Sequence, residues 1–292
     1  MELLVLAAGM GSRYGGLKQI DPVGPSGESL LDYAVFDALR AGFRRVTFVI
    51  RRDFEEVFER QVAAKYRGQV SVATVFQEMA DLPDGFAPGA DRIKPWGTGH
   101  AVWCARETVR EPFAVINADD FYGADSFRRL AEFLRMQGLA EEKPSRFAMV
   151  GFRLDRTLSE HGTVSRGVGR VEAGHLVSIV ERTAIAAADV GAGRAYRGDE
   201  IVSMNCWGFT PSLFPALGRG LRSFLQARGA EPKAEFYLPA SVAELIAAGE
   251  ARVDVLPTEA DWFGVTYRED RPRVAAAIAA RVCSGAYPLR LF

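Results

Sequence analysis

The chain opens with a short apolar run that leads directly into a loop of small residues. Residues 2–6 are Glu-Leu-Leu-Val-Leu, and residues 7–19 follow as Ala-Ala-Gly-Met-Gly-Ser-Arg-Tyr-Gly-Gly-Leu-Lys-Gln. We expect a buried strand that opens into a turn, where glycines let the backbone approach a ligand and point N–H groups at oxyanions. Arg13 and Lys18 add two positive charges where a polyphosphate would lie. We interpret this loop as a cradle for a nucleoside triphosphate.

The spacing of this loop differs from two well-known phosphate loops. Gly9 and Gly11 begin a GxGxxG pattern, but Tyr14 takes the third glycine position, which argues against a dinucleotide site and a nicotinamide dehydrogenase. The GxxxxGK[ST] loop is not matched either, because a leucine separates Gly16 from Lys18 and glutamine follows the lysine. The remaining pattern is LxxGxGxR, followed five residues later by lysine.

This pattern resembles the signature of the sugar-1-phosphate nucleotidyltransferase superfamily. In that family the loop wraps the triphosphate, the arginine and lysine neutralise it, and magnesium bridges the phosphates. The resemblance implies catalytic roles for Arg13 and Lys18. It also implies nucleotide contacts from the loop residues Ala7, Ala8, Gly9 and Gly11.

Composition narrows the class of protein. At 292 residues, the chain is long enough for one large α/β domain or two smaller ones, and 48% hydrophobic with 25% charged residues is typical of a soluble globule. A net charge of −1, with no basic run, argues against nucleic acid as a partner. Three widely spaced cysteines show neither a disulfide framework nor metal-ligand spacing.

Targeting signals are not apparent in the sequence. The N-terminal apolar run lacks a basic leader and is broken by Gly9 and Arg13, unlike a signal peptide. No segment approaches about 18 uninterrupted apolar residues, the length needed to span a membrane. We therefore expect a cytoplasmic protein without a membrane partner, and a homo-oligomer is left open.

Strand and helix patterns alternate in the first half of the chain. Apolar runs predict strands at 3–6, 46–50, 70–76 and 113–116, and amphipathic stretches predict helices at 29–39, 54–66 and 99–110. This alternation predicts an α/β fold with a Rossmann-like, mostly parallel central sheet and helices on both faces.

The second half of the chain changes character. Strands at 149–154, 162–171, 176–180 and 201–209 are separated by turns, and helices are predicted at 211–226 and 237–248. We expect a mixed region that extends the first sheet, so that residues 1–292 form one domain. With the resemblance, this is the nucleotide-diphospho-sugar transferase fold, with a nucleotide-binding half at 1–125 and a sugar-phosphate-binding half at 145–292. The long segment 79–95 has two open interpretations, a substrate lid and a passive surface loop.

Two segments around residues 77 and 98 predict contacts to a nucleobase. Gln77 follows a strand and offers both a donor and an acceptor, Gly97 allows close backbone approach, and Thr98 is expected to cap the next helix. Residues 99–120 closely resemble bacterial glucose-1-phosphate uridylyltransferases, and the resemblance implies base contacts from Gln77 and Gly97. For His100 we expect a structural role rather than that of a catalytic base.

Two aspartates follow the strand at 113–116. Adjacent carboxylates at a strand end are costly unless a cation or donors satisfy them, and hard oxygen ligands suit Mg²⁺. The resemblance assigns the metal to Asp119, which is also expected to be catalytic, with Asp120 beside it. An Asx-type turn that caps the following segment is the alternative.

The second half contains a sequence that resembles the family's sugar-phosphate contacts. Val180-Glu181-Arg182 is similar to Val-Glu-Lys, in which the glutamate holds sugar hydroxyls and the cation holds the sugar phosphate. Arginine keeps the charge of lysine but changes its geometry. Gly162 and Asn205 fall where the family places further sugar contacts.

Three features depart from the family pattern. Ala240 stands where a second metal-binding aspartate is expected, and Gly264 replaces the acid of a Trp-Phe-Asp motif. The interval from Arg13 to Lys18 is shorter than in the glucose-1-phosphate enzymes and closer to that of molybdenum-cofactor and isoprenoid-pathway cytidylyltransferases.

Together, these patterns predict magnesium-dependent transfer of a nucleotidyl group from an NTP, with UTP favoured, to a sugar 1-phosphate. The products would be an NDP-sugar and pyrophosphate. The short loop motivates one alternative, a cytidylyltransferase that acts on a non-sugar phosphate. The missing acids at 240 and 264 motivate another, a catalytically silent module that senses NDP-sugars.

Overall fold

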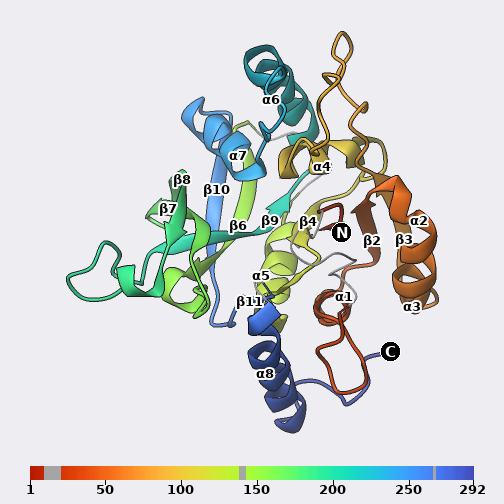
Figure 1. Ribbon diagram of the computed structural model, residues 1–292, viewed down its shortest axis with the longest axis vertical. Helices are drawn as coiled ribbons and strands as arrows, with labels where there is room; N and C mark the ends of the chain where they lie inside the picture. Colours follow the sequence, from red (N-terminus) through yellow and green to blue (C-terminus); the bar gives the residue numbers. More distant parts are fainter. Residues whose placement is uncertain (10–20, 138–142, 266–267) are drawn as a thin grey trace.

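A nine-stranded mixed sheet forms the centre of the fold (Figure 1). The computed structural model describes residues 1–9, 21–137, 143–265 and 268–292. The strands of the central sheet are β1 (Glu2–Leu6), β2 (Arg45–Ile50), β3 (Ser71–Phe76), β4 (Phe113–Asn117), β6 (Ser145–Arg153), β7 (Val164–Glu172), β8 (His175–Ile185), β9 (Ile201–Phe209) and β10 (Ala251–Pro257). Their order in the sheet is β3-β2-β1-β4-β9-β6-β10-β8-β7. A separate small sheet pairs β5 (Asp120–Phe121) with β11 (Phe263–Gly264).

The sheet is parallel in the first half of the chain and mixed in the second, as predicted, so the sheet as a whole is mixed rather than mostly parallel. β3, β2, β1 and β4 are parallel, and β6 is parallel to β10. β9 lies between β4 and β6 and runs antiparallel to both, and β7 pairs antiparallel with β8. A tight turn joins β7 to β8, with positive φ at Ala173 (49°) and Gly174 (80°), and a connection this short can only reverse the chain.

Helices cover both faces of the sheet, as predicted. Their bounds are α1 (Leu30–Ala41), α4 (Thr98–Cys104), α5 (Gly123–Arg135), α6 (Leu213–Arg228), α7 (Leu238–Ala247) and α8 (Arg271–Cys283). Side chains of β1 alternate between two apolar cores: Leu3 and Val5 pack with α1 and α5, whereas Leu4 packs with α4, α6 and α7. α1 begins at a capping box between Ser29 and Asp32. The sheet passes through both predicted halves, whose boundaries stay a prediction.

Two predicted helices are less regular than expected. The one at 54–66 is divided into η2 (Arg52–Phe54), α2 (Glu55–Phe58), the π-helical η3 (Glu59–Ala63) and α3 (Ala64–Tyr66). The one at 99–110 leaves the α conformation after Cys104 and continues as the 3₁₀ helix η4 (Ala105–Glu107). The sequence patterns missed α5, α8 and β10. In the described ranges, no helix is both long and apolar enough to cross a membrane.

A third apolar cluster holds the C-terminal segment against α1. Its polar centre is Asp37, which is 1% exposed and accepts a hydrogen bond from the Tyr287 hydroxyl (2.5 Å). Burial raises the pKa of Asp37 to about 7, although Tyr287 and Arg40 both favour its charged form. The other carboxylate oxygen of Asp37 has no hydrogen-bond partner among the described residues.

We expect Asp37 to make the stability of the fold depend on pH. An unfolded aspartate has a pKa of about 4, so between this pH and about pH 7 the folded protein keeps a proton that the unfolded chain has lost. The free energy of unfolding should therefore fall as pH rises through this interval. Asp37→Asn keeps an acceptor for Tyr287 and should be more stable than wild type at pH 8, by the order of 2 kcal/mol.

Urea unfolding from pH 4.5 to pH 8 measures this effect. Asp91→Asn, at an exposed position, is the control. Its free energy of unfolding should change with pH as that of the wild type does. The assignment is wrong if Asp37→Asn also keeps the pH dependence of the wild type.

Candidate functional site

The carboxyl ends of β1, β2, β3 and β4 lie at one edge of the sheet. Parallel pairing aligns these ends, which is where ligands bind in open α/β sheets. Three backbone hydrogen bonds extend the alignment past the strands: Ala7 N to Val49 O (2.8 Å), Gln77 N to Ile50 O (2.8 Å) and Ala118 N to Leu6 O (3.1 Å). The segments that follow the four strands therefore meet at one place.

The loop after β1 supplies the first of these segments. Ala7 and Ala8 are buried, and the Ala7 amide donates to Val49 O, so their predicted nucleotide contacts stay predictions. Around Gly9, a Cβ atom would meet no heavy atom within 4 Å, so this residue borders open space. Gly11, Arg13 and Lys18 lie outside the described residues, and their predicted contacts stay predictions.

His100 determines which end of the Gln77 amide faces the site. Gln77 Nε2 donates to Gly97 O (2.9 Å) and lies 3.2 Å from His100 Nδ1. His100 Nε2 lies 2.6 Å from Asp81 O, which can only accept, so Nε2 carries the proton and Nδ1 is an acceptor in the neutral ring. His100 is fully buried, and burial lowers its pKa. It is thus a structural residue, as expected, and it leaves the Gln77 carbonyl oxygen directed away from both partners.

Gly97 and Thr98 join the start of α4 to the start of α7. Gly97 has φ of 99°, and a Cβ atom there would lie 2.7 Å from Phe236 O. The Gly99 amide donates to the same oxygen (2.9 Å). The prediction that Thr98 caps its own helix is wrong: Gly97 precedes α4, and the Thr98 hydroxyl accepts from the Leu238 amide (3.0 Å). The Thr98 hydroxyl therefore binds the first residue of α7 instead of capping α4, as the local sequence had predicted.

The acidic pair lies after β4. Asp119 is partly exposed, whereas Asp120 is 8% exposed and begins β5. One Asp120 oxygen accepts hydrogen bonds from Asn117 Nδ2 (2.9 Å) and the Tyr122 hydroxyl (3.1 Å). These contacts hold Asp120 in one orientation beside Asp119.

Gly264 makes room for the Asp120 carboxylate. It is the antiparallel partner of Asp120 in the small sheet, and a Cβ atom at 264 would lie 2.6 Å from Asp120 Oδ1. Real Cβ atoms do not approach so closely, so any side chain at this position would have to displace the carboxylate. The glycine that replaces the family's acid at position 264 is therefore needed for the observed position of the Asp120 carboxylate.

Asn205 reaches the same place from β9. It has positive φ (56°), which is uncommon outside glycine, and its Nδ2 lies 3.4 Å from Asn117 Oδ1. Asn205 Oδ1 is enclosed and has no hydrogen-bond partner within the described parts of the chain. An enclosed, unsatisfied oxygen is costly, so it marks a position where a donor or cation from a ligand would be stabilised.

Arg166 is a site residue that the sequence patterns did not indicate. Its guanidinium carbon lies 4.9 Å from the centre of the Trp262 ring, and the residue is only 8% exposed. Burial lowers the pKa of Arg166 to about 10, against the opposing charges of Asp120 and Glu181. Because a lone arginine in a strand is usually exposed, no local signal could have placed this one between two carboxylates.

The other three predicted sugar-phosphate residues lie on the β7–β8 hairpin or just before it. Glu181 is exposed, yet partial desolvation raises the pKa of its carboxyl while Arg166 opposes the shift. Arg182 is exposed and is the cross-strand partner of Arg166. Gly162 is exposed just before β7. The geometry therefore associates Glu181 with Arg166 and Asp120, while the roles of Gly162 and Arg182 stay predictions.

The oxygen donors at this edge fit magnesium shared with a phosphate. Within the described ranges, no group of three or more His, Cys, Asp and Glu side chains could hold a metal ion alone. Mg²⁺ typically takes only one or two carboxylates and completes its shell with phosphate oxygens and water. Asp119 and Asp120 meet that requirement, and the unsatisfied Asn205 oxygen adds negative potential nearby.

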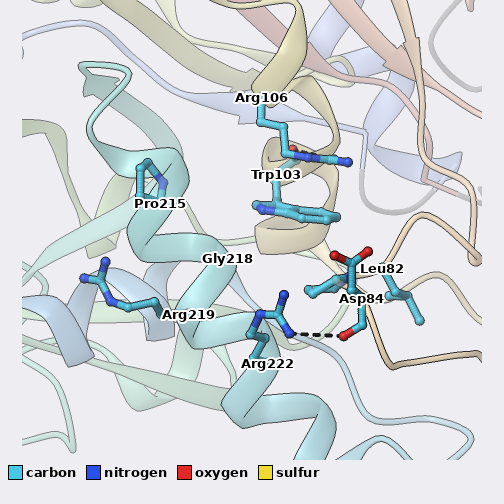
Figure 2. Close-up of a pocket in the computed structure, with 9 residues that line it drawn as sticks. Leu82, Asp84, Trp103, Arg106, Pro215, Gly218, Arg219 and Arg222 are labelled. Carbon is cyan, nitrogen blue, oxygen red and sulfur yellow. Dashed lines mark hydrogen bonds between the residues drawn. The ribbon is translucent and has the colours of Figure 1, made fainter.

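The loop at 79–95 is tied to η4, to α6 and to the segment between α6 and α7. Arg92 donates to Ala234 O (2.6 Å), Arg106 pairs with Asp81 (2.9 Å), and Arg222 donates to Asp84 O (3.1 Å). A pocket of about 370 Å³ opens between this loop and the helices, and Figure 2 shows its lining. Arg106 and Arg222 bond to the loop and anchor it, whereas Arg219 pairs with Glu250, outside the loop. The lid and the passive-loop interpretations both stay predictions.

Comparison with known families and proteins supports the predicted class. The family model for nucleotidyl transferases matches residues 3–223. The chain is 24% identical over 174 residues to a UTP–glucose-1-phosphate uridylyltransferase of Bacillus subtilis, covering 51% of this chain and 58% of that protein. It is 30% identical over 101 residues to one of Komagataeibacter xylinus, covering 31% and 34%. The matched stretches thus span less than two thirds of these relatives.

Solved structures share the fold along nearly the whole chain. A UDP-glucose pyrophosphorylase complexed with UDP-glucose aligns with a TM-score of 0.60 at 17% identity, covering 96% of this chain and 98% of that one. A putative glucose-1-phosphate thymidylyltransferase from Bacillus anthracis gives 0.63 at 14% identity, with 95% of both chains covered. The inositol-1-phosphate CTP transferase from T. maritima gives 0.61 at 14% identity, again over 95% of both.

Gly97 should be intolerant of any side chain. Gly97→Ala combines an unfavourable positive φ with a Cβ atom 2.7 Å from a backbone oxygen. We expect it to lower the free energy of unfolding by at least about 2 kcal/mol. Gly85→Ala is the matched control, because Gly85 also has positive φ (88°) but no atom near its Cβ position. It should cost only about 1 kcal/mol. Equal losses in urea denaturation would show that the close approach to Phe236 does not matter.

Proposed function

The chain belongs to the nucleotidyl transferase family, and from this premise we propose that it transfers a nucleotidyl group from UTP to a sugar 1-phosphate. The products would be an NDP-sugar and pyrophosphate. The observation that carries this proposal is the meeting of residues 7–9 after β1, Gln77 and the acidic pair at one edge of the sheet. The named activities of the relatives support the choice of UTP and of a sugar 1-phosphate.

Base recognition is assigned to Gln77 and Gly97. Because Gln77 donates both amide hydrogens inward, its carbonyl oxygen is the group left to accept a hydrogen bond. An acceptor at this place suits the N3–H of uracil or thymine, or the amino group of cytosine. Gly97, without a side chain, lets the backbone lie against the ring.

Phosphate activation is assigned to Arg13, Lys18 and Asp119. An oxygen of the acceptor's phosphate attacks the α-phosphorus, a new P–O bond forms, and the bond to the β-phosphate breaks as pyrophosphate leaves. The acceptor is already an anionic nucleophile, so alignment and charge neutralisation supply most of the catalysis. Arg13 would neutralise the leaving phosphates and Lys18 the α-phosphate. Magnesium, held by Asp119 with Asp120, would supply electrostatic stabilisation of the phosphates when bound.

Acceptor binding is assigned to the second half of the chain. Glu181 would accept hydrogen bonds from sugar hydroxyls, and Arg182 would pair with the sugar phosphate. The unsatisfied Asn205 oxygen supports a hydrogen bond from the same ligand, because it lies beside Asn117 at the end of β4. Gly162, just before β7, would leave space for the sugar.

Removing one of the charges at the reacting phosphates should abolish most activity. We expect Arg13→Gln and Asp119→Asn each to lower pyrophosphate release from UTP and glucose 1-phosphate by about 10²–10³-fold. Glu132→Gln, on the exposed face of α5, is the control and should act like wild type. Retention of activity within a few-fold in both variants would refute the proposed mechanism.

The same assay separates the alternatives. Pyrophosphate release with CTP and none with UTP would favour a cytidylyltransferase. Tight binding of an NDP-sugar, with no turnover across a panel of sugar 1-phosphates, would favour a sensing module.

His100 should influence UTP binding through Gln77. His100→Phe removes the acceptor that orients the Gln77 amide, and we expect KM for UTP to rise about 5–10-fold with little change in kcat. If His100 acts through Gln77, the double variant His100→Phe/Gln77→Leu should bind UTP no more weakly than Gln77→Leu alone. Cys104→Ala, which removes a contact to the same ring, is the packing control. Additive losses in the double variant would contradict this coupling.

A further inference from the structure

The β7–β8 hairpin (Figure 1) carries a buried charge that the proposed function does not use. We propose that Arg166 is a second binding residue for the acceptor, and that it holds the phosphate group of the sugar 1-phosphate together with Arg182. This inference rests on the proposed function and assigns a subsite within it.

The buried charge of Arg166 has no anion in contact with it in the described residues. Arg166 is 8% exposed, and in the described residues all of its hydrogen bonds go to neutral oxygens rather than to a carboxylate. A buried cation without a contacting anion is strongly unfavourable, whereas a bound anion would reverse that cost. Asp120 and Glu181 interact with it only at longer range. Their negative charge stabilises the guanidinium without occupying its contact surface.

The hydrogen-bond donors of Arg166 are held in a fixed arrangement. Arg166 Nε donates to Thr157 Oγ1 (3.2 Å), Nη1 donates to Ser165 O (2.8 Å), and Nη2 donates to Thr157 O. All three acceptors are neutral, and the Trp262 ring lies against the guanidinium. This shell fixes the orientation of the group, and its remaining N–H bonds have no acceptor in the described residues. A preorganised guanidinium with spare donors is suited to the oxygens of a phosphate.

Arg182 places a second positive charge beside Arg166. It lies directly opposite Arg166 in the hairpin, and like charges at such positions repel one another. Arg182 is exposed and forms no ion pair within the described parts of the chain. A phosphate dianion between the two arginines would convert this repulsion into two favourable contacts. Sugar hydroxyls are neutral and would not, so the phosphate rather than the sugar ring is the group that fits.

The location agrees with the chemistry of transfer. The Trp262 ring that lies against Arg166 also borders Gly264, the strand partner of Asp120, at the edge where the nucleotide phosphates are proposed to bind. Glu181, proposed to bind the sugar, pairs across the hairpin with Gly167, the neighbour of Arg166. The acceptor's phosphate joins these two parts, so its binding residue must lie between them. Arg166 meets that condition.

Steady-state kinetics and calorimetry test the assignment, with glucose 1-phosphate and UTP varied separately. We expect Arg166→Gln to raise KM for glucose 1-phosphate about 10–100-fold, the effect of losing a charge-assisted hydrogen bond. KM and Kd for UTP should stay within about 3-fold of wild type. Arg166→Lys keeps the charge but not the fork of donors, and should recover part of the acceptor affinity. Arg170→Gln, an exposed arginine of the same strand paired with Glu172, should change neither constant.

The outcomes distinguish this subsite from the function on which it rests. Wild-type protein that releases no pyrophosphate with any acceptor would overturn the proposed function, and calorimetry with inorganic phosphate would still test Arg166. An active wild type, with acceptor affinity unchanged in Arg166→Gln, would overturn the subsite alone. The subsite would also be overturned if Arg166→Gln weakened the binding of UTP and of the acceptor equally, or if both Arg166 variants failed to fold. Arg166 would then be purely structural.

Discussion

The parallel pairing of β1, β2, β3 and β4 is the constraint on which the rest of the molecule depends. Parallel register places the carboxyl ends of these strands side by side, so that residues far apart in the chain meet without any direct sequence relationship. This arrangement brings residues 7–9, Gln77 and the acidic pair close together. Apolar side chains on both faces hold the strands in register, as the alternation along β1 shows.

The antiparallel strand β9 brings the second half of the chain to the same edge. Its pairing with β4 joins Phe209 to Phe113 and Trp207 to Val115, which leaves Asn205 level with the end of β4. From there the sheet continues into the β7–β8 hairpin, which pairs with β9 and carries Arg166 and Glu181. A single mixed sheet therefore links the proposed nucleotide and acceptor sites.

Neighbouring residues hold the charged side chains at this edge in fixed positions. Gly264 leaves the space that the Asp120 carboxylate fills, and Asn117 and Tyr122 hold that carboxylate in place. On the other side, Thr157 and Trp262 hold the Arg166 guanidinium. The protein thus keeps charges of both signs in a partly buried site, where interactions with a phosphate substrate are stronger than in water.

The amino-acid sequence by itself determined the α/β class, the positions of most strands and the family, because apolar periodicity and short motifs are local properties. It also indicated a structural role for His100, but not the orientation that His100 imposes on Gln77. Only the tertiary structure decided the direction of β9, the partner of the Thr98 hydroxyl and the burial of Arg166. These features depend on which distant segments of the chain lie together. Such contacts do not change the pattern of apolar and polar residues in the sequence around a residue.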